Sequence, residues 1–109
     1  MSYSLIATPT FRQGLKRLAK KFPSLKEEYA DLLDELQQNP AIGTPIGNNC
    51  FKIRLAIASK GKGKSGGARV ITYVVVADLT IYLLDIYDKS EQANISDKEL
   101  LQLLKYLRD

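Results

Sequence analysis

Two strand sequences follow one another in the stretch RVITYVVVADLTIYLLDIY, residues 69–87. Residues 69–76 and 79–87 are rich in β-branched and aromatic side chains, which favour strands. Only Ala77 and Asp78 lie between the two runs, and a connection this short joins strands that run in opposite directions. The stretch therefore predicts an antiparallel hairpin, around which the rest of the fold is built.

A third strand is predicted before this hairpin, at CFKIRLAI, residues 50–57. Its apolar residues alternate with charged ones, which is the period of a strand with one buried and one solvated face. The buried face would hold Phe51, Ile53, Leu55 and Ile57. Lys52 and Arg54 would emerge from the opposite face, so this strand predicts a cationic surface on the sheet.

Two amphipathic helices are predicted on the N-terminal side, after a short strand at residues 3–7. Residues 9–22 carry an apolar stripe on an otherwise basic helix, and residues 24–36 carry one on an acidic helix. Pro23 separates the two, and Ser24 with Glu27 matches the S-x-x-E capping box of a helix start. We expect the two helices to pack antiparallel as a helical hairpin.

The remaining segments are predicted as connections and a last helix. Residues 39–49 contain two prolines and two glycines, a composition that breaks both helices and strands. Residues 58–68, ASKGKGKSGGA, are rich in glycine and lysine and predict a flexible connection. Ser96 and Glu99 form a second capping box, which begins a terminal amphipathic helix that continues to Leu107.

This order of strand, two helices, three strands and a final helix predicts an α+β fold. We expect an N-terminal strand, a helical hairpin packed on a mainly antiparallel twisted sheet, and a C-terminal helix. The length of 109 residues is close to the commonest size of one domain, so residues 1–109 are expected to form a single domain. The helical hairpin would cover the apolar face of the sheet and leave Lys52 and Arg54 exposed.

Positive charge is concentrated in the middle of the chain. The net charge is +4, and no acidic residue lies between Glu35 and Asp78, where six basic residues do. These six are Lys52, Arg54, Lys60, Lys62, Lys64 and Arg69. Such an asymmetry points to a polyanionic partner, because each phosphate that is neutralised releases counterions and adds affinity. The alternative is a solvated loop whose lysines serve solubility.

The composition excludes several classes of site. Without histidine, and with Cys50 as its single cysteine, the chain cannot assemble the usual zinc or copper ligand sets, a Ser-His-Asp triad or an internal disulfide, and no cofactor is expected. Residues 61–67 resemble a phosphate loop in composition, but their spacing is wrong and they precede a strand. There is no secretory signal and no run of about 20 apolar residues, so we expect a cytoplasmic protein.

What remains is cationic chemistry on a polyanion. RNA can be cut without a metal when its 2′-hydroxyl is deprotonated, the pentavalent phosphate is stabilised and the leaving 5′-oxygen is protonated. Arginine and lysine stabilise the phosphate directly, and a tyrosine at the end of a strand can stack on a base or donate a proton. Tyr73 and Tyr87 are candidates for this role, although packing is the better interpretation of Tyr73.

Three segments together resemble a known family: CFKIRL at residues 50–55, GKGKSGGARVITY at residues 61–73 and LLDIYDKSEQANIS at residues 83–96, followed by a short helix. Their order and spacing are similar to the RelE/ParE superfamily of toxins from bacterial toxin–antitoxin pairs, most of all to its HigB-like branch. The resemblance covers nearly the whole chain. It implies a RelE-like fold, metal-independent endoribonuclease activity on mRNA in the ribosomal A site that inhibits translation, and a cognate antitoxin that wraps a basic site.

The resemblance also assigns site residues. Lys52 and Arg54 match the paired basic residues on the central strand of RelE-like toxins, and Arg69 matches an arginine that contacts phosphate. Lys89 lies near another basic position of the family, just past the last strand. Three further lysines are expected to contact ribosomal RNA as general positive charge: Lys60, Lys62 and Lys64.

Some of these assignments have alternatives. Tyr87 stands somewhat before the place of the family's base-stacking aromatic residue, which reads Asn94-Ile95 in this chain. Lys52 and Arg54 could simply solvate an exposed strand. Arg69 could form a structural ion pair, with Asp85 or Asp88 as its partner.

Two other functions stay open. A ParE-like toxin would share the fold but inhibit DNA gyrase without being an enzyme, and the basic residues on the strand face favour the ribonuclease over it. An inactive relative would bind nucleic acid without cutting it. Because binding and cleavage use the same charges, only an assay separates that relative from the ribonuclease.

Overall fold

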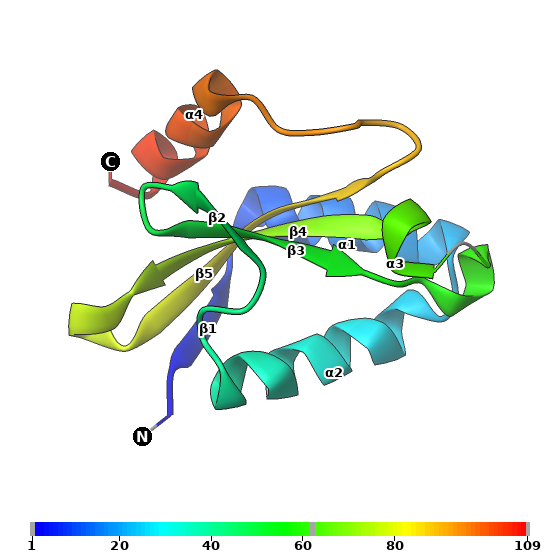
Figure 1. The fold of residues 1–109 in the computed structure, drawn as a ribbon, viewed down its shortest axis with the longest axis horizontal. Helices are drawn as coiled ribbons and strands as arrows, with labels where there is room; N and C mark the ends of the chain where they lie inside the picture. Colours follow the sequence, from blue (N-terminus) through cyan, green and yellow to red (C-terminus); the bar gives the residue numbers. More distant parts are fainter. Residues whose placement is uncertain (1, 62, 109) are drawn as a thin grey trace.

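A five-stranded sheet forms the centre of the computed structural model, which describes residues 2–61 and 63–108 (Figure 1). Its strands are β1 (Ser4–Ala7), β2 (Thr44–Gly47), β3 (Cys50–Leu55), β4 (Ala68–Val75) and β5 (Thr80–Asp88), in the spatial order β1-β5-β4-β3-β2. β1 pairs parallel to β5, and the other neighbouring strands pair antiparallel. The predicted hairpin is confirmed as β4 and β5.

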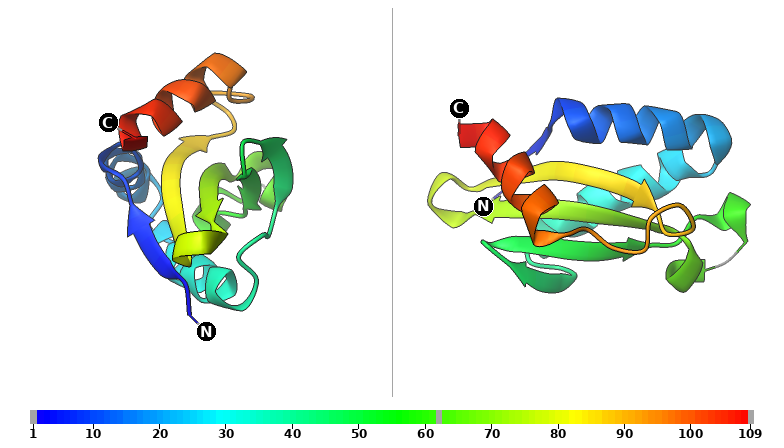
Figure 2. Two further views of the ribbon diagram at one scale, coloured as in Figure 1. Left: turned by 90° about the vertical axis from the view of Figure 1, so that its left-hand side faces the viewer. Right: turned by 90° about the horizontal axis from the view of Figure 1, so that it is seen from above.

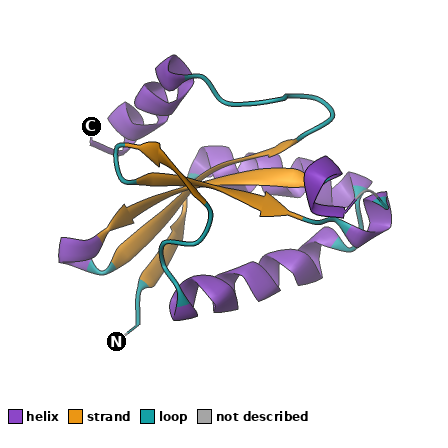
Figure 3. Ribbon diagram, in the orientation of Figure 1, coloured by secondary structure: helices purple, strands orange, loops and turns teal. Residues whose placement is uncertain are grey.

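Helices cover both faces of the sheet (Figure 2). α1 (Pro9–Lys21) and α2 (Leu25–Gln38) lie on one face, and α4 (Asp97–Arg108) lies on the other. Figure 3 distinguishes the sheet from its covering helices by colour. The predicted α+β fold, with a helical pair on a mainly antiparallel sheet, is therefore confirmed. No helix within the described residues has both the length and the apolar character needed to cross a bilayer.

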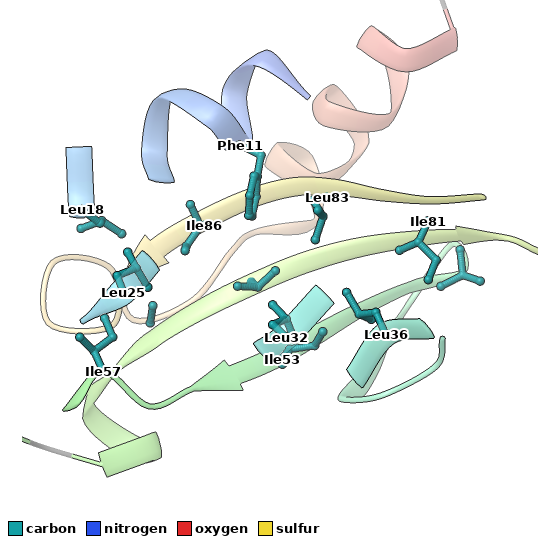
Figure 4. Packing of buried hydrophobic residues seen from close by; sticks show 13 residues of the cluster. Phe11, Leu18, Leu25, Leu32, Leu36, Ile53, Ile57, Ile81, Leu83 and Ile86 are labelled. Carbon is teal, nitrogen blue, oxygen red and sulfur yellow. The ribbon is translucent and has the colours of Figure 1, made fainter. Parts of the chain in front are cut away.

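Two apolar layers hold the helices to the sheet. The larger layer lies between the sheet and the pair α1 and α2, and it contains Phe11, Leu18, Leu32 and Ile53 (Figure 4). The smaller layer joins α4 to the opposite face. Its buried members are Cys50, Ile71, Leu84, Tyr87, Leu100 and Leu104. The side chains of the central strands therefore alternate between two apolar layers, as the period of a strand requires.

A β-bulge interrupts the pairing of β4 with β5. Ile71 pairs with Asp85 and Thr72 pairs with Leu83, so Leu84 is an extra residue in β5. Neighbouring side chains in a strand point to opposite faces, and an extra residue shifts that alternation by one position. As a result, Leu83 before the bulge and Ile86 after it both join the layer beneath α1 and α2.

Two segments that were predicted to be irregular contain short regular elements. Thr44–Gly47 forms β2, an edge strand whose register with β3 shifts between Pro45 and Gly47. In the glycine-rich connection, a 3-10 turn spans Ala58–Lys60 and a single helical turn, α3, spans Gly63–Gly66. Gly67 then lies directly against β3, because a Cβ at this position would stand 2.1 Å from the carbonyl oxygen of Leu55. Only glycine fits this return into β4 without moving the two strands apart.

The two predicted capping boxes have different outcomes. At α4 the prediction is confirmed, because Glu99 N donates to Ser96 Oγ at 3.1 Å and Ser96 N donates to Glu99 Oε1 at 3.2 Å. At α2 the prediction is wrong, because Ser24 has helical φ and ψ and its side chain makes no capping hydrogen bond among the described residues. Its hydroxyl instead donates to Glu28 Oε1 at 3.1 Å and lies 2.8 Å from Ser59 Oγ.

Replacing Ser96 with alanine should lower the free energy of unfolding by about 1 kcal/mol, because an N–H in the first turn of α4 loses its acceptor. Ser96→Thr keeps the hydroxyl and should retain most of the stability. Urea denaturation of both variants beside the wild-type protein measures the difference. Equal losses in the two variants would contradict a capping role for the hydroxyl.

Candidate functional site

Three of the predicted site residues form one row across the sheet. Arg54 of β3 pairs with Arg69 of β4, and Arg69 pairs with Tyr87 of β5. Directly paired residues of neighbouring strands point to the same face, with their Cβ atoms about 5 Å apart. The register therefore places Arg54, Arg69 and Tyr87 side by side on three neighbouring strands. We call these residues the cross-strand row.

Lys52 lies on the same face as the cross-strand row, two residues before Arg54. Its Nζ donates a hydrogen bond to Asn94 Oδ1 at 3.3 Å. Asn94 belongs to residues 89–96, here called the strap, which leads from the end of β5 back over the sheet to α4 (Figure 1). The strap thus holds the ammonium group of Lys52 above the sheet. Nothing in the local sequence pattern predicted this contact.

Lys89 begins the strap, just past the end of β5. Its backbone N–H donates to Gly67 O at 3.0 Å, which extends the pairing of β4 with β5. Its Nζ donates to Ala93 O, also at 3.0 Å. Lys89 follows Tyr87 by two positions and lies just outside β5, in the turn that begins the strap. It therefore lies near the end of the strand that carries Tyr87.

The cross-strand row is open at one end and covered at the other. Arg54 is exposed, whereas Arg69 and Tyr87 each expose only 4% of their surface. Tyr87 packs in the apolar layer beneath α4, and a guanidinium nitrogen of Arg69 donates to Ala68 O at 3.1 Å. A phosphate that approaches this face would therefore meet Arg54 first.

The surroundings of Tyr87 favour the protonated phenol. Burial raises the pKa of Tyr87 above its ordinary value; the Arg69 guanidinium opposes this shift, and the carboxylates of Asp85 and Glu99 reinforce it. No described residue forms a hydrogen bond with its buried hydroxyl. Tyr87 is therefore suited to donate a proton at neutral pH and poorly suited to accept one.

Two carboxyl groups near Tyr87 were not predicted as part of the site. Asp85 and Glu99 line a cavity of about 330 Å³ between β5, α4 and the first turn of α1. Burial raises the pKa of Asp85; a hydrogen bond from Ile86 N at 2.9 Å opposes the shift, and Glu99 adds to it. The carboxylates of Asp85 and Glu99 thus add to the effect of burial on the pKa of Tyr87.

Lys60 differs from the free surface charge that we expected. Its Nζ forms an ion pair with Asp88 and donates to Ser90 Oγ at 2.6 Å. The side chains of Lys60 and Asp88 expose only 8% and 2% of their surface. Because a buried charge needs a partner, Lys60 links the connection after β3 to the end of β5. The predictions for Lys62 and for the side chain of Lys64 lie outside the described residues.

The cationic residues do not share one pocket. A cavity of about 520 Å³ at the edge of the sheet is lined by Lys52 and Arg54, whereas Arg69 and Tyr87 are not among its lining residues. The cross-strand row is therefore a face of the sheet and not the floor of a single cavity. Across residues 2–61 and 63–108, no group of three histidine, cysteine, aspartate or glutamate side chains is arranged to hold a metal ion.

The fold is similar to the folds of solved RelE toxins. A mutant of the Escherichia coli toxin RelE in the free state matches with a TM-score of 0.65 at 17% identity, over 97% of this chain and 98% of that one. The intact E. coli RelBE toxin–antitoxin complex matches with a TM-score of 0.60 at 17% identity, over 80% and 96%. The RelBE2 toxin–antitoxin complex of Mycobacterium tuberculosis matches with a TM-score of 0.59 at 17% identity, over 81% and 99%. At these identities the likeness shows a shared fold.

The sequence shows the family. Residues 11–108 match the family described as the RelE toxin of the RelE/RelB toxin–antitoxin system. The matched range contains every residue of the cross-strand row, together with Lys52 and Lys89. This chain belongs to the RelE toxin family.

Proposed function

We propose that this toxin is a metal-independent endoribonuclease that cleaves mRNA in the A site of the translating ribosome, in the cytoplasm, and so inhibits translation. The observation that carries the proposal is the cross-strand row of Arg54, Arg69 and Tyr87. It combines two permanent positive charges with a proton donor on one face of the sheet. Lys52 and Lys89 lie near this row, and both ammonium groups are held by the strap.

The proposed reaction moves one proton from the 2′-hydroxyl and delivers one to the 5′-oxygen. The 2′-oxygen attacks the adjacent phosphorus, the bond from phosphorus to the 5′-oxygen breaks, and the products are a 2′,3′-cyclic phosphate and a 5′-hydroxyl. Arg54 and Arg69 stabilise the negative charge that grows on the phosphate, because a guanidinium can bind two of its oxygens at once. Tyr87 protonates the leaving 5′-oxygen.

We assign the acceptor of the 2′-proton to Lys52 or Lys89, which would act in its uncharged amine form after its ammonium group has released a proton to solvent. A guanidinium does not lose its proton in proteins, so Arg54 and Arg69 cannot act as a base. Tyr87 already carries its proton at neutral pH, because its pKa is raised, so it cannot accept the proton of the 2′-hydroxyl. The two lysines are the remaining side chains of this group that can exchange a proton near the phosphate.

The burial of Arg69 and Tyr87 supports a requirement for the ribosome. In the free protein α4 covers the phenol, whose hydroxyl has no contact with solvent. RNA would reach this hydroxyl only after α4 moves outward, whereas it would meet the exposed Arg54 at once. Binding to the ribosome would stabilise the open arrangement, so free RNA should be a poor substrate.

We also propose a cognate antitoxin as the partner of this toxin. Similar toxins have been solved in complex with their antitoxins, among them E. coli RelE with an antitoxin peptide. An acidic and apolar segment would neutralise Arg54 and Lys52 on the open part of the face, or lie in the groove beside α4. Such a segment would compete with mRNA for the same charges.

Purified protein added to ribosomes that carry a defined mRNA should produce new mRNA 5′ ends within the A-site codon, which primer extension maps. The upstream fragment should end in a 2′,3′-cyclic phosphate, and naked mRNA should stay intact under the same conditions. If the protein binds the ribosomes but the mRNA stays uncleaved, the protein is an inactive relative. Intact mRNA together with loss of gyrase supercoiling activity would identify a ParE-like inhibitor.

A further inference from the structure

The outer edge of β3 is unpaired over part of its length. β2 pairs with residues 50–52 of β3, and within the described ranges 2–61 and 63–108 no strand pairs with Ile53, Arg54 or Leu55 on that side. Every second residue of such an edge points its N–H and C=O groups away from the sheet, where an added strand can bind them. The backbone of Gly43 lies directly against one end of this free edge. A Cβ at Gly43 would stand only 2.6 Å from the carbonyl oxygen of Lys52.

A groove of about 520 Å³ follows this free edge, between β3 and α2. On the α2 side it is lined by three carboxylates, those of Glu28, Asp31 and Glu35. Asp31 and Glu35 are exposed, whereas Glu28 accepts hydrogen bonds from Ser24 Oγ and from Ala58 N. The groove therefore combines free backbone groups on one wall with free negative charge on the other.

Within residues 2–61 and 63–108, no ion pair joins Lys52 or Arg54 to this acidic wall. Lys52 and Arg54 line the groove, but strand alternation directs their side chains to the face opposite α2. On that face the ammonium group of Lys52 is bound to Asn94. The exposed carboxylates of Asp31 and Glu35 are thus available to an outside ligand.

We propose that this groove binds an extended, basic segment of a partner protein, which adds to β3 as a further strand. Asp31 and Glu35 lie about 6 Å apart along the helix axis, since each residue of a helix rises 1.5 Å. Side chains two residues apart on one face of a strand are separated by about 6.6 Å. Two basic side chains at alternate positions can therefore reach both carboxylates while the backbone pairs with β3.

This surface meets the cross-strand row at Arg54, which belongs to both, but the proposal needs no RNA cleavage. The three residues 53–55 of the free edge span about 10 Å, which is enough for about three residues of an added strand. The bound segment would carry charge opposite to that of the antitoxin segment proposed to neutralise Arg54 and Lys52. The basic segment in the groove and the acidic segment on the cationic face could belong to one partner chain or to two separate partners.

The test uses a capped, fluorescently labelled peptide in which valine and lysine alternate. Its anisotropy should report binding at low salt, and the double variant Asp31→Asn/Glu35→Gln should weaken the affinity about 2- to 30-fold through the loss of two exposed ion pairs. The double variant Glu27→Gln/Asp34→Asn is the matched control, since it makes the same charge change on α2 outside the groove. This control should bind as the wild-type protein does.

Three further ligands test the strand addition itself. A peptide that alternates valine and glutamate should not bind, and neither should the lysine peptide after N-methylation of alternate backbone amides. Amide resonances of residues 53–56 should shift when the unmodified peptide is added. Equal weakening in both double variants, undiminished binding of the N-methylated peptide, or equal competition by a simple polyamine would each overturn the proposal. None of these outcomes bears on the ribonuclease, which the ribosome assay tests by itself.

Discussion

Replacing Asp88 with alanine should lower the free energy of unfolding by about 3–5 kcal/mol. The substitution removes the carboxylate that pairs with Lys60 and leaves the ammonium group buried, with Ser90 Oγ as a remaining polar contact at 2.6 Å. A buried charge without its counter-charge is costly, because the protein interior cannot replace its hydration. Denaturant unfolding at neutral pH measures the loss.

The same ion pair should make the protein less stable in acid. Burial alone would raise the pKa of Asp88, but hydrogen bonds from Lys60 and Ser90 outweigh burial, so this pKa lies below its ordinary value. A carboxyl group of this kind stabilises the folded state above its unfolded pKa, and the contribution is lost as the pH falls through its folded pKa. The stability advantage of the wild-type protein over Asp88→Ala should therefore shrink with acidification.

Two comparisons isolate the effect of burial. Glu91→Ala removes the partner of Arg17 from an ion pair with 55% and 47% exposed side chains, and it should cost about 0–1 kcal/mol. Lys60→Met combined with Asp88→Leu replaces the buried pair by apolar side chains and should recover most of the stability. If Asp88→Ala costs no more than Glu91→Ala, the buried pair does not stabilise the fold as described.

Replacing Arg69 with alanine should slow mRNA cleavage on the ribosome by about 10²–10³-fold, if the proposed function is correct. Arg69 stands between Arg54 and Tyr87 in the cross-strand row, where the proposed mechanism puts the charge of the pentavalent phosphate. A group that acts on developing charge changes the rate more than the affinity. Single-turnover cleavage at saturating ribosome concentration separates these two quantities.

Because Arg69 is buried, its variants must be shown to fold before their activity is interpreted. Arg69→Lys keeps the charge but loses the two-pronged geometry, so its rate should fall between those of Arg69→Ala and the wild-type protein. Arg17→Ala, which loses only an exposed ion pair, should cleave at the wild-type rate. A folded Arg69→Ala protein with wild-type cleavage would remove Arg69 from the proposed mechanism.

Much of the fold could be predicted from the sequence, because local patterns decide it. The alternation in residues 50–55 placed Lys52 and Arg54 on one face, and the short turn after residue 75 specified the hairpin. The pairing of Arg54 with Arg69 depends on register, which no local pattern in this chain encodes. Two further expectations stay predictions: that this toxin is most similar to the HigB-like branch, and that its residues form a single domain.

Long-range polar contacts could not be predicted. Lys60 resembled the other lysines of a glycine-rich run, yet its partner Asp88 lies in the last strand. Ser24 fitted a capping box, yet its hydroxyl lies against Ser59, in a distant segment. A pattern of residue types shows which surface is polar, but it does not show which polar group will be buried by another part of the chain.

The extra residue Leu84 affects how this toxin should be aligned with its relatives. If β5 continued from Leu83 without a bulge, Ile86 would stand beside Arg69, and Tyr87 would point into the layer beneath α1 and α2. A relative without the bulge would carry its counterpart of Tyr87 one position closer to the hairpin turn. An alignment that counts residues of β5 from the hairpin turn would therefore match the wrong residues of the two chains. The counterpart of Tyr87 is better identified as the residue that pairs with the arginine on β4.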